Sequence, residues 1–149
     1  MKKYAGYIHL KPINGVLYPS SIQNILMKEY VNKKLRSIFY LSPTEVIQAK
    51  YSVTMNTLLS NETKVNGIVM LSSFSLPKNY KERQNILKEA YKNKKEIHFI
   101  LDEIIFKKPI DSAEIEEQVL FDQAFFTNIK KKLNKLDKII LKKNKISFV

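Results

Sequence analysis

The chain lacks the residues that the commonest kinds of functional site require. Its 149 residues include no cysteine, which excludes disulfide frameworks, thiolate metal sites and catalytic thiols. The three glycines, Gly6, Gly15 and Gly67, are too far apart to form GxGxxG or a P-loop. Two histidines, His9 and His98, are too few for an imidazole-only metal site, and the motifs HExxH and GxSxG are absent. These absences exclude the common motif-bearing enzymes but not catalysis in general, and we predict no metal and no cofactor.

Long hydrophobic runs are also lacking. No window approaches 18 uncharged apolar residues, so we predict no membrane span. The first residues reach Pro12 without the apolar region of a signal peptide. Apolar residues make up 44% of the chain, with eight phenylalanines and eight tyrosines, which is typical of a folded domain. We therefore expect one cytoplasmic domain with a substantial core.

Arginine is scarce in a strongly basic chain. The net charge is +12, yet only Arg36 and Arg83 among the 26 basic residues are arginine. Arginine is preferred for bidentate contacts with phosphate and guanine. The abundance of Ile, Asn and Lys is typical of an AT-rich genome. We therefore interpret most of the charge as solvated surface, and we disfavour nucleic acid as a partner.

The segment VNGIVMLSSFSLP, residues 65–77, combines a candidate core with a candidate site. The nearly all-apolar run 67–71 predicts a strand buried on both faces, in the middle of a parallel sheet. The segment becomes polar at Ser72, where that strand would end. Ligands of open α/β sheets bind beyond the carboxyl ends of the strands. We therefore predict a cleft bordered by these hydroxyl groups.

Strands and helices alternate along the first hundred residues. The predicted strands are 4–10, 37–41, 67–71 and 96–101, and the predicted helices are 20–34, 53–59 and 80–92. Residues 104–107 fit either a short strand or an extended link. This alternation predicts an α/β fold with an open, mainly parallel sheet of four to five strands, flavodoxin- or resolvase-like in its order 2-1-3-4, and helices on both faces. Two apolar stripes are expected to face inward: Ile22, Ile25, Leu26 and Tyr30 in the first helix, and Ile86, Leu87, Ala90 and Tyr91 in the third.

The last third of the chain predicts a C-terminal helical extension. Asp111 and Ser112 suit a helix start, and from Thr127 the chain is basic and amphipathic. Its apolar stripe would comprise Ile129, Leu133, Leu136 and Ile140, with Ile139 beside it. We expect an α/β domain over 1–126 and a basic helix over 127–149 that packs on the domain or on a second subunit. An anionic membrane surface or nucleic acid is the alternative partner.

Polar side chains follow the predicted strands and would meet at one edge of the sheet. They include His9, Ser73, Asp102 and Glu103. A carboxylate near a histidine forms an acid–base pair, and a helix start at Ser20 offers an anion site. Structural roles remain open for the same residues. His98 could face the sheet, Ser73 could cap a turn, Glu103 could pair with lysine, and Arg83 could form a salt bridge or bind a ligand anion.

Four segments, GYIHLKPINGVLYPSSIQN, LSPTE, VNGIVMLSSFSLP and KEIHFILDEI, resemble the sporadic carbohydrate cluster proteins. These are bacterial proteins encoded among surface-polysaccharide and lipopolysaccharide genes, and the resemblance covers about residues 6–120. It implies a pathway and no particular reaction. His9 and Lys11 depart from the pattern, which argues against a catalytic His9. The positions associated with the pattern are Gln23, Asn24, Glu45, Tyr51, Ser73, Phe74, Pro77, Arg83, His98 and Glu103.

The resemblance implies a site for a sugar or nucleotide-sugar. Sugars are held by amide and carboxylate groups beside an aromatic platform, which Tyr51 or Phe74 would supply. We expect catalytic roles for Glu45, Ser73, His98 and Glu103. We expect substrate binding by Gln23, Asn24, Tyr51, Phe74 and Arg83.

A weaker similarity is to the catalytic domain of serine recombinases. The segment Tyr7–Lys11 is similar to their first strand, and a helix entered through SSIQ follows it. No serine stands directly after that strand, and Ser75–Lys78 lacks the expected arginines. This similarity implies a shared fold without DNA strand transfer. The alternative function is therefore a nucleic-acid or protein interaction module.

Overall fold

The computed structural model describes residues 1–13, 15–41 and 53–147, with side chains up to residue 142. The described residues form a five-stranded sheet in the order β2-β1-β3-β4-β5. The neighbours β2, β1, β3 and β4 are parallel, and β5 is antiparallel to β4. The strands are β1 (Lys3–Gly6), β2 (Ile38–Tyr40), β3 (Gly67–Met70), β4 (Glu96–Phe99) and β5 (Ile104–Phe106). The predicted mainly parallel sheet and its order are confirmed. The uncertain segment 104–107 forms a strand, antiparallel because a short turn joins it to β4.

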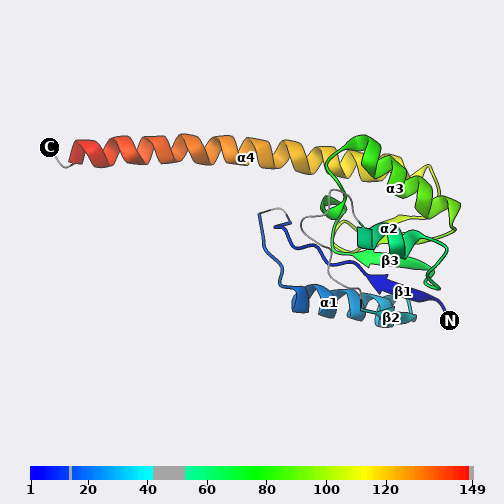
Figure 1. Cartoon of the computed structure of the whole chain (residues 1–149). Helices are drawn as coiled ribbons and strands as arrows, with labels where there is room; N and C mark the ends of the chain where they lie inside the picture. Colours follow the sequence, from blue (N-terminus) through cyan, green and yellow to red (C-terminus); the bar gives the residue numbers. More distant parts are fainter. Residues whose placement is uncertain (14, 42–52, 148–149) are drawn as a thin grey trace.

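Helices cover both faces of the sheet, as predicted (Figure 1). The helix α1 (Ser20–Glu29) continues as a π-helical segment, η1 (Tyr30–Lys34), and lies on one face. The other face is covered by α2 (Val53–Leu59), α3 (Tyr80–Lys92) and the start of α4 (Asp111–Ser147). A short 3-10 turn, η2 (Ser73–Ser75), follows β3. The bounds of α2 and α3 are those predicted.

Strand β3 is the centre of the fold, because every one of its residues is buried and it pairs with both β1 and β4. Its side chains alternate between two cores. Ile68 and Met70 belong to the core beneath α2, α3 and α4. Val69 and Leu71 belong to the core beneath α1. This confirms that the apolar segment after Asn66 is a central, doubly covered strand.

The inward face of α1 differs from the predicted one. Ile22 and Ile25 are 43% and 60% exposed, whereas Gln23, Met27 and Val31 are buried. The Gln23 amide binds backbone groups of the preceding loop, which turns its own side of the helix inward. A prediction based only on the spacing of apolar residues therefore chose the stripe of Ile22 and Ile25 in place of the buried one. In α3 the predicted residues Ile86, Leu87 and Ala90 are buried, but Tyr91 is exposed and the inward face also includes Arg83.

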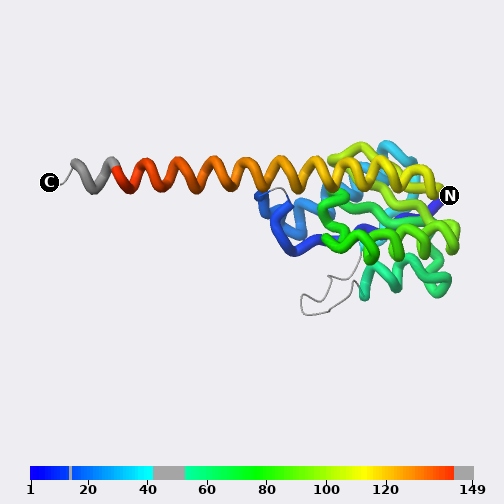
Figure 2. Tube along the Cα trace, turned by 90° about the horizontal axis from the view of Figure 1, so that it is seen from above, coloured from blue at the N-terminus to red at the C-terminus, as the bar shows by residue number. Residues whose placement is uncertain are grey.

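Helix α4 runs without a break through the predicted domain boundary at residue 126. Ile115 and Val119 are buried in the core, and Phe126 makes an edge-to-face contact with Phe74. Beyond this contact the helix leaves the domain, as both views show (Figures 1 and 2). Leu133 and Leu136 are 54% and 53% exposed. In the described part of the chain, the apolar stripe beyond this contact is therefore largely exposed to solvent. Over the described residues, none of the helices has the length and hydrophobicity needed to cross a membrane.

Candidate functional site

Asp102 organises the chain where it leaves β3. Its carboxylate accepts hydrogen bonds from the Ser72 hydroxyl (2.9 Å to Oδ1) and the Ser73 backbone N–H (2.6 Å to Oδ2). Ser72 Oγ in turn accepts the Phe74 N–H at 3.2 Å and caps η2. Because β3 and β4 are parallel, Asp102 after β4 reaches the same edge as Ser72. This clamp fixes the polar turn beyond β3.

A cavity of about 210 Å³ lies beside this turn, between η2 and α4. The rings of Phe74 and Phe126 border it, with their centroids 6.3 Å apart. Its polar groups are Ser73, Lys78, Gln123 and Thr127, and its remaining lining residues are Leu76, Pro77 and Val119. The cavity therefore lies at the strand edge predicted from the sequence, and it combines aromatic surface with hydroxyl, amide and ammonium groups.

The two elements that border the cavity, η2 and α4, carry buried polar atoms without partners in the described part of the chain, and one of these residues, Ser73, lines the cavity. Ser73 Oγ, Ser75 Oγ and Asp122 Oδ2 have no hydrogen-bond partner among the described residues. Asp122 is 5% exposed, and its other carboxylate oxygen accepts a bond from Gln118. Burial, together with the nearby charge of Asp102, raises the pKa of Asp122. Since buried polar atoms are nearly always hydrogen-bonded, these oxygens mark a place where a polar ligand or water would bind.

Gln23 is a positioning residue. Its Oε1 accepts the His9 N–H at 2.9 Å, and its Nε2 donates to the carbonyls of His9 (2.6 Å) and Tyr18 (2.8 Å). The amide is thus occupied in holding the segment between β1 and α1, and it does not face the cavity lining. The neighbouring Asn24 is half-buried, and its Oδ1 has no partner in the described part of the chain.

Arg83 forms a salt bridge, which was one of its two predicted roles; the other was binding of a ligand anion. Its Nε and Nη2 donate to the two oxygens of Glu116, at 3.0 and 2.6 Å. Its Nη1 donates to the carbonyls of Pro77 (3.0 Å) and Lys78 (2.6 Å). Burial would raise the pKa of Glu116, but hydrogen bonds from Arg83 and Gln84 lower it overall. Arg83 therefore ties α3 to α4 and supports the Pro77–Lys78 rim of the cavity.

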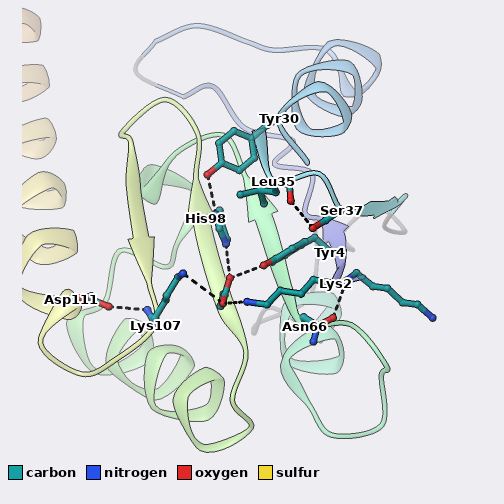
Figure 3. A network of polar contacts seen from close by, with 11 residues as sticks. Lys2, Tyr4, Tyr30, Leu35, Ser37, Asn66, His98, Lys107 and Asp111 are labelled. Carbon is teal, nitrogen blue, oxygen red and sulfur yellow. Dashed lines mark hydrogen bonds and ion pairs between the residues drawn. The ribbon is translucent and has the colours of Figure 1, made fainter. Parts of the chain in front are cut away.

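His98, the third of the four residues of β4, belongs to a second polar network, which extends from the ring to the amino ends of β1 and β4 (Figure 3). The buried ring lies 2.9 Å from the Tyr30 hydroxyl through Nδ1 and 3.0 Å from Glu96 Oε2 through Nε2. Glu96 also accepts hydrogen bonds from Tyr4 and Lys2, both at 2.6 Å. Ser73 follows the opposite, carboxyl end of β3, so the structure does not combine His98 and Ser73 in one site.

The protonation states in this network follow from burial and charge. Burial would raise the pKa of Glu96, but hydrogen bonds from Lys2, Tyr4 and His98 lower it to about 2. Burial also lowers the pKa of His98 in spite of its bond to Glu96. The neutral ring therefore donates from Nε2–H to Glu96 and accepts the Tyr30 O–H at Nδ1. Hydrogen bonds thus connect the Tyr30 hydroxyl through the His98 ring to the Glu96 carboxylate.

The remaining predicted residues are not in the cavity. Glu103 is exposed in the turn between β4 and β5, with φ of 56°, and its neighbour Asp102 makes the contacts at the site. Glu45 and Tyr51 lie outside the described residues.

Sequence reasoning gave no polar or catalytic role to Asp122, Glu96 or Tyr30, and it placed Tyr30 only in the apolar stripe of the first helix. Two of them carry a signal in the sequence. Asp122 interrupts the apolar side of α4, and Glu96 stands two residues from His98, on the same face of one strand.

Fold and site together define an α/β protein with an open, mainly parallel sheet and a small cavity beyond its central strand. No family model matches the chain, and the comparison with curated proteins gives no significant match.

Proposed function

We propose that the protein binds a sugar or nucleotide-sugar in the cavity between η2 and α4, as a cytoplasmic enzyme or accessory of bacterial surface-carbohydrate synthesis. The observation that carries the binding proposal is the cavity itself, which joins an aromatic pair to Ser73, whose buried Oγ has no partner among the described residues. The pathway rests on the resemblance of four sequence segments to the sporadic carbohydrate cluster proteins.

Each chemical group at the cavity has a counterpart in such a ligand. Phe74 and Phe126 offer apolar faces for a sugar ring or a base. The hydroxyl of Ser73 and the amide of Gln123 would exchange hydrogen bonds with ligand hydroxyls. Lys78 would neutralise a phosphate. Asp122, next to Gln123 in α4, has a raised pKa because of its burial and the nearby charge of Asp102.

The binding proposal is tested by titrating the protein with UDP-, GDP- and dTDP-linked hexoses and with hexose phosphates. We expect a thermal shift and NMR shift changes at η2 and residues 119–127 of α4. Ser73→Ala should weaken binding about tenfold, the cost of one hydrogen bond of about 1.4 kcal/mol. The matched control, Ser112→Ala, removes a hydroxyl at the start of α4, away from the cavity lining. Absence of a response to every probe contradicts the proposal.

A second candidate function is a nucleic-acid or protein interaction module with a flavodoxin- or resolvase-like fold. The strand order is the one expected for such a fold, and the basic end of α4 is exposed. Residues 118–149 carry eight lysines, which would supply phosphate contacts, against two aspartates. DNA affinity should then fall steeply with salt and be lost on deletion of residues 127–149. A flat salt response, or no binding at low salt, rules out the nucleic-acid form.

A further inference from the structure

Helix α4 carries one continuous heptad pattern from the domain into its free part. The residues of the pattern alternate at spacings of four and three: Ile115, Val119, Asp122, Phe126, Ile129, Leu133, Leu136 and Ile140. The first four lie against the domain, and the last four are exposed. Such a repeat brings residues to a single narrow seam on a helix that pairs with another helix.

We propose that the free part of α4 pairs with the same segment of a second copy of this chain, as a two-stranded coiled coil. The seam would bury Ile129, Leu133, Leu136 and Ile140. Among the described residues these side chains are 36–54% exposed, and the stability of helices in proteins comes mostly from packing of an apolar face. The association is independent of the proposed ligand.

The charges beside the seam identify the second copy as the partner. Asp137 is the single acidic residue after Asp122, and it flanks the seam at the heptad position called e. In a parallel pair it meets Lys132 of the second copy at position g. In an antiparallel pair centred between Leu133 and Leu136 it meets Lys130. Either arrangement forms two opposite-charge contacts by symmetry.

Other partners fit this surface less well. A helix that lies on a membrane has a broad apolar face, whereas Lys130 and Lys132 border this seam closely on its two sides. Asp137 beside the seam would also face anionic lipid. Nucleic acid would contact the lysines and leave the leucines uncovered.

The first experiment measures the mass of the full chain by analytical ultracentrifugation from 1 to 200 µM. We expect a dimer that Leu133→Asp converts to a monomer. Lys131→Asp and Lys138→Asp change the charge on the side of the helix opposite to the seam, and they should leave the dimer unchanged. A monomer at every concentration overturns the proposal, as does a dimer that Leu133→Asp does not weaken.

The second experiment exchanges the charges of residues that would pair across the dimer. A restored pair cannot be explained by unfolding of the helix. Asp137→Lys alone should weaken the dimer about tenfold. Mixing it with Lys132→Asp should restore a heterodimer if the pair is parallel, and mixing it with Lys130→Asp should do so if it is antiparallel. Either rescue supports the proposal. Failure of both, or association of the chain only with anionic vesicles or with DNA, contradicts it.

Discussion

Two carboxylates at opposite ends of the sheet hold its parallel strands together through side-chain contacts. Asp102 joins the turn after β4 to the turn after β3. Glu96 joins the start of β4 to Tyr4 in β1 and to Lys2 just before it. Each carboxylate accepts several hydrogen bonds at once, which is the arrangement in which a buried charge stabilises a fold.

Replacement of Asp102 should loosen the turn after β3. Asp102→Asn keeps the shape but removes the charge and leaves Ser72 or Ser73 with a poorer acceptor, so we expect a loss of about 1–2 kcal/mol in the free energy of unfolding. Urea denaturation measures it. The adjacent exposed carboxylate provides the control, Glu103→Gln, which should change little. Equal stability of the two variants would show that the clamp contributes nothing.

Acid should destabilise the protein through the network around Glu96. The pKa of Glu96 is about 2 in the fold against 4.5 in the unfolded chain, so the unfolded state binds more protons between these values and stability falls as pH drops below about 5. The lowered pKa of His98 acts in the same direction, beginning below its ordinary value of 6.5.

Glu96→Gln should therefore flatten the stability profile between about pH 5 and pH 2. At pH 7 we expect a loss on the order of 2 kcal/mol. Denaturation across a pH series measures both effects, with Glu62→Gln, an exposed carboxylate, as the control. An unchanged acid limb in Glu96→Gln would contradict this assignment.

Among the elements, α3 and α4 depend on one buried arginine. The five-donor guanidinium of Arg83 contacts a carboxylate and two carbonyls in one plane, and an ammonium cannot reproduce that fork. The salt bridge therefore couples the packing of two helices to the rim of the cavity. This explains why arginine is present at a buried position of a chain in which lysine predominates.

Arg83→Lys should cost about 2–4 kcal/mol, because Glu116 is left half-buried with an incomplete partner. Chemical denaturation measures the change. The reciprocal exchange on the exposed side of the same helix, Lys88→Arg, should stay within about 0.5 kcal/mol. If both exchanges have the same small effect, the bridge is not a structural requirement.

Prediction from the sequence was most accurate for strands that are buried on both faces of the sheet. It was least accurate where a polar side chain is buried in the core. The strand around Ile68 and the bounds of α2 and α3 follow from apolar patterns, and the structure confirms them. The predicted inward face of α1 was wrong, because the Gln23 side chain is buried where it forms hydrogen bonds with backbone groups. Ser73 and Phe74, which follow the central strand, border the cavity, but its other side is formed by α4, and no local pattern reveals that α4 lies against this turn.

For the whole molecule, the α/β domain should not depend on the free part of α4. The buried core of the described residues ends near Asp122, so a chain ending at residue 128 should keep its free energy of unfolding within about 0.5 kcal/mol at 1 µM. Its melting temperature should lose any dependence on protein concentration. Thermal and urea denaturation of both chains measure this, and a loss above about 2 kcal/mol would contradict it.

Gly67 limits how the sheet can assemble. At this residue β3 passes so close to β4 that a Cβ would lie 2.2 Å from the Glu96 carbonyl oxygen. A slip of one residue would place Asn66 or Ile68 at that point, and neither side chain fits. Gly67 therefore helps to set the register between β3 and β4. That register also determines which residues of the two following turns lie side by side at the cavity.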